Sequence, residues 1–130
     1  MILRGEETIL LVDDADMVLE VGKEILEALG YDVLVAGNGK EAIEVYENNK
    51  EKIDLIILDM IMPGMGGGEV YEHLKEINRD IKVLLSSGYS IEGQATEILK
   101  RGCNGFIQKP FTIAKLSHKI REILDKQKVQ

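Results

Sequence analysis

The chain has 130 residues, of which 16 are Lys or Arg and 23 are Asp or Glu, and its formal net charge is -7. This length suits a single domain around one core, and the negative charge, spread along the chain, argues against direct binding of nucleic acids as the main role. The single cysteine, Cys103, excludes an internal disulfide and is expected to be a small buried residue in a reducing compartment. No apolar run suits a signal peptide or a membrane span, so the chain as given is expected to be soluble and cytoplasmic, without membrane contact.

Five apolar runs that are typical of buried strands alternate with five segments of helical periodicity. The strands are expected at residues 9–12, 31–36, 55–58, 81–86 and 105–108. Four consecutive bulky apolar residues at 55–58, without polar alternation, are typical of a central strand that is buried on both faces of a parallel sheet.

The helices are expected at residues 15–29, from Asn38 to about 49, after the glycines at 66–68, from Ser90 to 100, and after Thr112. Asn38 with Glu41 resembles a capping box, and Ser90 and Thr112 are expected helix caps. Apolar residues recur every fourth position of the first helix, at Met17, Val21, Ile25 and Leu29, with Val18 and Leu26 beside them.

Such alternation of strands and helices implies an α/β fold with a parallel sheet and right-handed crossovers. Helices on both faces of the sheet would make a three-layer α/β/α sandwich. We expect residues 1–130 to form a single domain, with a lead-in at 1–7 and a core at 8–127.

Acidic residues follow two of the expected strands. Asp13 and Asp14 end the first strand and Asp59 ends the third, so the three carboxylates converge if these strands are neighbours. Like charges at close range raise at least one pKa, and a bound divalent cation is the usual remedy. A hard cation such as Mg²⁺, which binds oxygen ligands and keeps several waters, suits this site.

Polar groups also follow the last two strands. The fourth strand ends in Ser86 and Ser87, and the fifth is followed by Lys109 and Pro110. A hydroxyl and an ammonium facing a metal-bound carboxylate are the groups needed to hold a phosphoryl group on that carboxylate. Taken one at a time, these residues would be solvated acids, a turn serine and a surface lysine.

Four motifs give the chain a family resemblance: VDDADM at 12–17, LDMIMPGMGG at 58–67, LLSSGYS at 84–90 and QKPF at 108–111. In order and spacing they resemble the receiver domain of two-component response regulators, over essentially the whole chain. The resemblance implies a flavodoxin-like sheet of strand order 2-1-3-4-5. It also implies that Asp59 accepts a phosphoryl group from the phosphohistidine of a sensor histidine kinase.

The resemblance assigns further roles at the site. Asp14 would hold Mg²⁺ directly and Asp13 largely through water, and the backbone carbonyl of Ile61 would be a further ligand. Ser87, rather than Ser86, falls on the switch hydroxyl, and Lys109 would reach the phosphoryl oxygens.

Other implied features concern the switch and the access of water. The peptide bond between Lys109 and Pro110 is expected to be cis. The switch aromatic is Phe106, which lacks the hydroxyl of a tyrosine, and the signalling surface would be residues 90–127. Bulky side chains at Ile61 and Tyr89 are expected to limit the access of water to the phosphoryl group.

Two stretches of the sequence resemble one particular group within this family. RGEETILLVDD at 4–14 and the run at 84–111 resemble the C-terminal receiver domains of hybrid sensor histidine kinases. The expected partners are therefore a sensor histidine kinase and a histidine phosphotransfer domain. The expected activity is self-catalysed phosphotransfer and dephosphorylation, without turnover of a free metabolite.

Three other classes fit the sequence less well. A haloacid-dehalogenase-type phosphatase requires a second aspartate where Ile61 stands, and a P-loop nucleotidase requires a Gly-Lys-Ser/Thr motif that is missing. A flavodoxin-like electron carrier requires a phosphate-binding loop where the chain has DDAD at 13–16. An alternative that stays open is an interaction module on the same fold that signals without phosphorylation.

Overall fold

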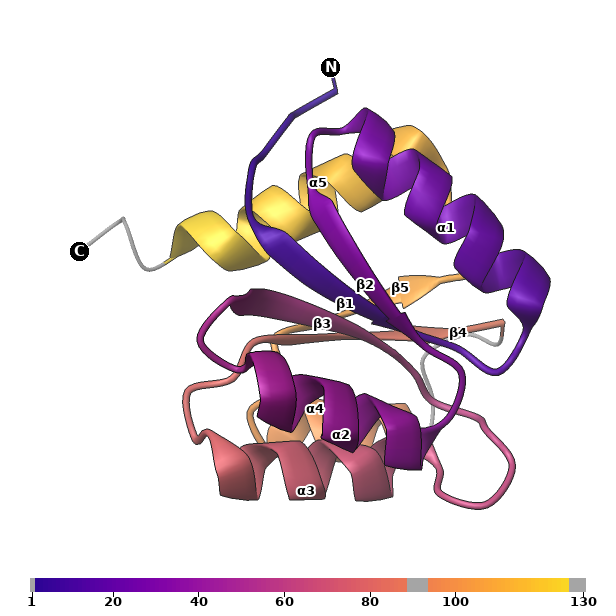
Figure 1. Cartoon of the computed structure of the whole chain (residues 1–130), viewed down its shortest axis with the longest axis vertical. Coiled ribbons are helices and arrows are strands. Elements are labelled where there is room, and N and C mark those ends of the chain that lie inside the picture. Colours follow the sequence, from indigo (N-terminus) through magenta and orange to yellow (C-terminus); the bar gives the residue numbers. More distant parts are fainter. Residues whose placement is uncertain (1, 89–93, 127–130) are drawn as a thin grey trace.

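A computed structural model describes residues 2–88 and 94–126, in which five strands alternate with five helices (Figure 1). The elements are β1 (Thr8–Val12), α1 (Asp16–Ala28), β2 (Asp32–Ala36), α2 (Gly39–Asn49), β3 (Ile53–Asp59), α3 (Gly67–Ile77), β4 (Val83–Ser87), α4 (Gln94–Lys100), β5 (Gly105–Gln108) and α5 (Ile113–Asp125).

The five strands form one parallel sheet of order β2-β1-β3-β4-β5, which confirms the predicted order. In the ladder, Val12 of β1 pairs with Leu58 of β3. The carboxyl ends of these two strands therefore lie side by side. Figure 1 shows α1 and α5 on one face of the sheet and α2, α3 and α4 on the other, which is the predicted three-layer sandwich.

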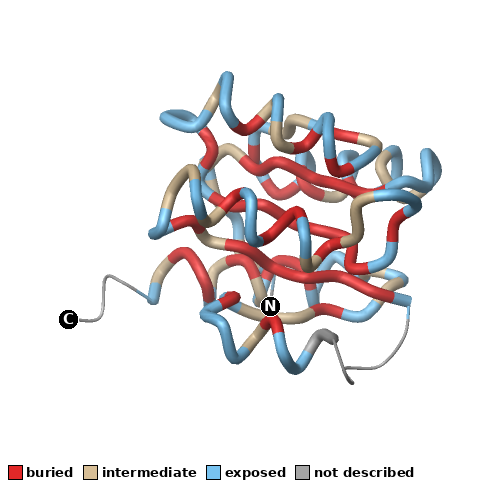
Figure 2. The backbone as a smooth tube through the Cα atoms, turned by 90° about the horizontal axis from the view of Figure 1, so that it is seen from below, coloured by how far each residue is buried: buried red, intermediate tan, exposed pale blue. Residues whose placement is uncertain are grey.

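The core has two halves, one on each face of the sheet, and β3 contributes to both. Ile56 and Leu58 belong to the half beneath α2 and α3, whereas Leu55 and Ile57 belong to the half beneath α1 and α5. All four side chains are buried because the central strand is covered on both faces. Figure 2 shows the same layering, with buried residues along the strands and exposed residues on the outer turns of the helices.

One face of α1 differs from the prediction. Met17 is 76% exposed and Val21 is 48% exposed, while the helix buries Gly22 and Leu26. A Cβ atom on Gly22 would lie 2.7 Å from a methyl carbon of Leu11, so the helix approaches β1 most closely at this glycine. This close approach turns Met17 and Val21 outward, and the predicted four-residue stripe is therefore wrong in its first half.

Two predicted helix caps are present. The Asn38 side-chain oxygen accepts a hydrogen bond from the Glu41 amide at 2.8 Å, and Glu41 accepts one from the Gly37 amide at 2.6 Å. Thr112 accepts a hydrogen bond from the Lys115 amide at 3.2 Å. The predicted cap at Ser90 lies outside the described residues. No helix in the described part of the chain has the length and hydropathy that crossing a bilayer requires.

Candidate functional site

Three aspartates meet at the carboxyl ends of β1 and β3. Asp13 directly follows β1, Asp14 comes next, and Asp59 is the last residue of β3. One carboxylate oxygen of each lies within 4.8 Å of the others. Asp13 is 1% exposed and Asp59 is 3% exposed, whereas Asp14 is open to solvent. The cluster thus consists of two buried carboxylates and a third one that is accessible to solvent.

Lys109 is the cation that faces this cluster. Its Nζ donates hydrogen bonds to Asp13 Oδ2 at 2.8 Å and to Asp59 Oδ1 at 3.2 Å. The lysine follows β5, its amide donates to the Ser87 carbonyl at 2.7 Å, and its peptide bond to Pro110 is cis. One ammonium therefore bridges the acids that come from two different strands.

The close acids change the proton affinities at the site. Burial and the neighbouring charge of Asp13 raise the pKa of Asp59 to about 6, although Lys109 opposes the shift. Burial alone would lower the pKa of Lys109, but its bonds to the two carboxylates outweigh burial and raise it. One lysine therefore does not compensate the acids fully, and the site retains an affinity for further positive charge.

The acid cluster has the ligand chemistry that Mg²⁺ requires. Its three side chains offer hard carboxylate oxygens close together, and the exposed Asp14 leaves the site accessible. Mg²⁺ accepts one or two carboxylates while it retains waters. These residues fit the predicted cation.

The remaining predicted residues surround the acids. Ser86 pairs with Asp59 in the β3–β4 ladder, and Ser87 lies one residue farther toward the carboxyl edge; both are buried. Ile61 is 58% exposed, and its amide lies 3.5 Å from Asp59 Oδ1. Phe106 of β5 is half-buried and packs against the core beneath α2 and α3. Their roles remain predictions, and Tyr89 lies outside the described residues.

One glycine that supports the site was not singled out from the sequence. A Cβ atom on Gly67, the first residue of α3, would lie 2.7 Å from both the Asp59 carbonyl oxygen and the Met60 Cα atom. The Gly67 amide donates to the Met60 carbonyl at 2.9 Å. Helix α3 therefore starts against the backbone that carries Asp59. The three consecutive glycines at 66–68 were a signal, but spacing alone does not tell which of them makes this contact.

Comparisons with known proteins agree with this geometry. A family described as the response regulator receiver domain matches residues 9–121. The sensor kinase CckA of Brucella abortus is 35% identical over 125 residues, which cover 96% of this chain but only 13% of that kinase. The two-component response regulator 24 of Arabidopsis thaliana is 37% identical, over 84% of this chain and 78% of its own length.

Solved structures show the same fold. A response regulator receiver domain protein from Clostridium thermocellum superimposes with a TM-score of 0.89 at 29% identity, covering 95% of this chain and 98% of that one. The receiver domain of the hybrid histidine kinase CckA gives a TM-score of 0.75 at 34% identity, over 90% and 98%. A CheX–CheY–BeF₃–Mg²⁺ complex from Borrelia burgdorferi gives 0.85 at 27% identity, over 90% and 88%.

Proposed function

Because this chain belongs to the response regulator receiver domains, we propose that it serves in phosphorelay signalling and that Asp59 accepts a phosphoryl group from the phosphohistidine of a partner kinase. The observation that carries the proposal is the meeting of Asp13, Asp14 and Asp59, with Lys109 bonded to two of them. A cation and an ammonium beside a buried carboxylate are what a stable aspartyl phosphate requires.

Each residue of the site would have a different role in phosphoryl transfer. A carboxylate oxygen of Asp59 forms the new bond to phosphorus, and the bond between phosphorus and the histidine nitrogen breaks. Asp13, Asp14, Asp59 and the Ile61 carbonyl would hold Mg²⁺, which when bound supplies positive charge to the phosphoryl oxygens. Lys109 would bond those oxygens after leaving Asp59, and Ser87 would donate a hydrogen bond to them.

The same site would act as a switch. Phosphorylation would draw Ser87 toward the phosphoryl group, and Phe106 would turn inward behind it, changing the face formed by residues 90–127. Because Phe106 has no hydroxyl, its coupling to Ser87 would be steric. The alternative output is relay of the phosphoryl group onward to a histidine phosphotransfer domain.

Exposed apolar side chains beside the acids suit contact with a protein that donates the phosphoryl group. Met17 lies three residues after Asp14, and Ile61 lies two residues after Asp59; both are exposed. The proposal has three further parts: residues 1–130 form a single receiver domain, this domain belongs to a hybrid kinase, and it acts in the cytoplasm.

The proposal includes limited catalysis by the chain itself. The site would promote transfer to Asp59 and later hydrolysis of the aspartyl phosphate by water, without turnover of a free metabolite. Ile61 lies at the site mouth, where a bulky side chain would limit the access of that water.

Intact mass measurement tests the proposal directly. The protein is incubated with acetyl phosphate, with and without Mg²⁺, and compared with Asp59→Asn. Asp54→Asn is the matched control, because Asp54 lies on the same strand but is exposed at its opposite end. One added phosphoryl group is expected in the wild type and the control, only with Mg²⁺, and none in Asp59→Asn.

Beryllofluoride binding separates the other outcomes. A protein that binds beryllofluoride with Mg²⁺ but ignores acetyl phosphate accepts the group from its kinase alone, which agrees with the proposal. A protein that does neither is the interaction module that signals without phosphorylation, and the proposal would then be wrong.

A further inference from the structure

The lead-in segment, residues 2–7, is bound to two helices at the edge of the sheet opposite to the acids. The Gly5 amide donates to the Leu29 carbonyl at 3.0 Å, and Arg4 donates to the Ala28 carbonyl at 3.1 Å, both at the end of α1. The Leu3 amide donates to the Ser117 hydroxyl of α5 at 3.3 Å. The segment therefore lies between α5 and the end of α1 and contacts both before the chain enters β1.

An ion-pair network joins this segment to the second half of α5. Arg121 donates from its two terminal nitrogens to the two carboxylate oxygens of Glu7, at 2.7 and 2.9 Å. The same guanidinium bonds Asp125 one helical turn later, at 3.1 and 2.6 Å, and the Tyr31 hydroxyl at 3.3 Å. The Arg121 side chain is 12% exposed, so this bidentate pair is shielded from water more than an ordinary surface pair.

The lead-in segment lies very close to its neighbours at two glycines. A Cβ atom on Gly5 would overlap the Tyr31 ring and the Arg121 guanidinium. Gly30 has φ of +104°, and a Cβ atom there would overlap the Gly5 carbonyl oxygen. Two glycines thus let the segment lie directly on α5 and on the turn after α1.

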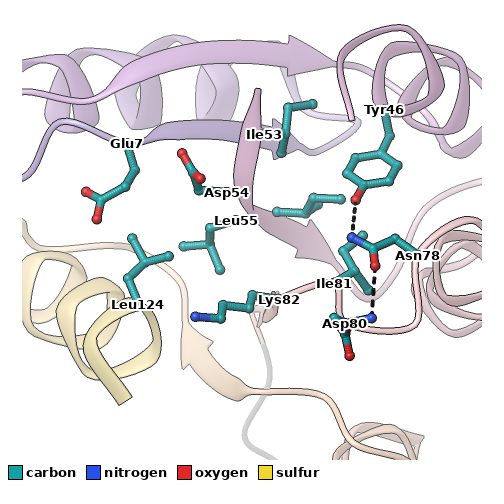
Figure 3. A pocket seen from close by; sticks show the side chains of 11 residues that line it. Glu7, Tyr46, Ile53, Asp54, Leu55, Asn78, Asp80, Ile81, Lys82 and Leu124 are labelled. Carbon is teal, nitrogen blue, oxygen red and sulfur yellow. Dashed lines mark hydrogen bonds between the residues drawn. The ribbon is translucent and has the colours of Figure 1, made fainter. Parts of the chain in front are cut away.

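The last turn of α5 packs against the core and borders a hollow at Leu124. Figure 3 shows Glu7 and Leu124 on the same side of this hollow, which lies at the amino ends of the strands. Leu116 and Ile120 anchor the preceding turns of α5 in the core. Ile123 and Leu124 of the last turns are buried in the same core, and Arg121 adds polar contacts to Glu7 and Tyr31 outside its own helix.

We propose that residues 2–7 form a strap that fixes α5 from Ser117 onward to the sheet, so that rearrangement of the 90–127 face is confined to α4, β5 and residues 113–116 of α5. The first part of this inference is independent of the proposed function. The second part rests on it, because it concerns the change on phosphorylation.

Amide hydrogen exchange measured by mass spectrometry tests the strap. Glu7→Ala removes the carboxylate, and Gly5→Ala displaces Arg121 without any change of charge. Glu6→Ala is the matched control, because it removes the same charge from the neighbouring exposed residue. We expect amides at 120–125 to exchange about tenfold faster in both strap variants and unchanged in the control, while β3 keeps its protection.

Two results would overturn the strap. If amide exchange at 120–125 stays as in the wild type in both variants, the end of α5 does not depend on residues 2–7. Faster exchange everywhere, β3 included, would show that the segment contributes only to global stability. Thermal unfolding of each variant identifies this second case.

A second arm adds beryllofluoride with Mg²⁺. In the wild type, changed exchange is expected in α4, β5 and residues 113–116 but not at 120–125; in Glu7→Ala it is expected to extend to 120–125. Changed exchange at 120–125 in the wild type would show that the rearrangement reaches the end of α5, which contradicts the second part of the inference. It would not contradict the first part, that residues 2–7 fix this helix. Failure to bind beryllofluoride, together with no phosphoryl uptake from acetyl phosphate, would overturn the proposed function and with it the second part of the inference. The first arm still decides the strap.

Discussion

Replacing Asp59 by asparagine should make the metal-free protein more stable at neutral pH, although it removes the proposed acceptor. Burial and the charge of Asp13 raise the pKa of Asp59 from its ordinary value of 3.8 to about 6. The folded protein therefore holds this proton more tightly than the unfolded chain does. Stability is lost as the pH rises from about 4 to about 6, and the full penalty is present above that range.

The size of the effect follows from the same shift. At about 1.4 kcal/mol for each tenfold change in proton affinity, ionised Asp59 costs the fold up to about 3 kcal/mol. Asparagine has nearly the same shape without the charge. Lys109 keeps its bond to Asp13 at 2.8 Å in the variant, so its ammonium is not left unpaired.

Urea unfolding in the presence of EDTA measures this difference. We expect Asp59→Asn to be more stable than the wild type by up to about 3 kcal/mol at about pH 7.5, with the advantage shrinking toward about pH 4.5. Asp54→Asn, at an exposed carboxylate of the same strand, should change stability little. Added Mg²⁺ should stabilise the wild type more than Asp59→Asn. An Asp59→Asn protein no more stable than the wild type at about pH 7.5, or an equal advantage at both pH values, would refute the reasoning.

Three further substitutions have expected outcomes. Gly67→Ala places a Cβ atom 2.7 Å from the Asp59 carbonyl, so it should slow phosphorylation by acetyl phosphate and cost about 2 kcal/mol in urea unfolding; Gly68→Ala, which meets only the Ile98 side chain at 3.3 Å, should do neither. Lys109→Ala leaves Asp13 and Asp59 without their shared cation, so the pKa of Asp59 should rise further and intact mass should show no phosphoryl uptake, whereas retained uptake would contradict the role of Lys109. Asn38→Ala removes the cap of α2 and should lower the free energy of unfolding by about 1 kcal/mol, with Asn48→Ala, at an exposed position of the same helix, as the control.

The strands were predictable because each has a run of apolar residues, which is longest and uninterrupted in the central strand at 55–58. The central strand, predicted at 55–58, extends over Ile53–Asp59, and the acids at the strand ends meet once β1 and β3 are neighbours. The outward turn of Met17 and Val21 was not predictable from periodicity, because it depends on how closely Gly22 approaches Leu11. Apolar spacing places residues on a helix but does not say which side of a broad stripe meets the sheet.

Long-range polar contacts were the other part that the sequence did not reveal. Glu7 and Arg121 are 114 residues apart, and each alone is typical of a solvated surface charge. The double contact of Lys109 with Asp13 and Asp59 likewise depends on where β5 lies in the sheet. Such pairs follow from the topology and the rotamers together, which a local pattern does not contain.

The parallel sheet order has a consequence for the newly synthesised chain. Lys109 meets Asp59 across 50 residues of sequence and Asp13 across 96, because the site draws on β1, β3 and the segment after β5. A nascent chain that has emerged only through β4 carries all three aspartates but lacks the lysine that bridges them. Such a chain has unopposed acids where the complete domain has a paired site, so under the proposed function it would become competent to accept a phosphoryl group only when the last strand has joined the sheet.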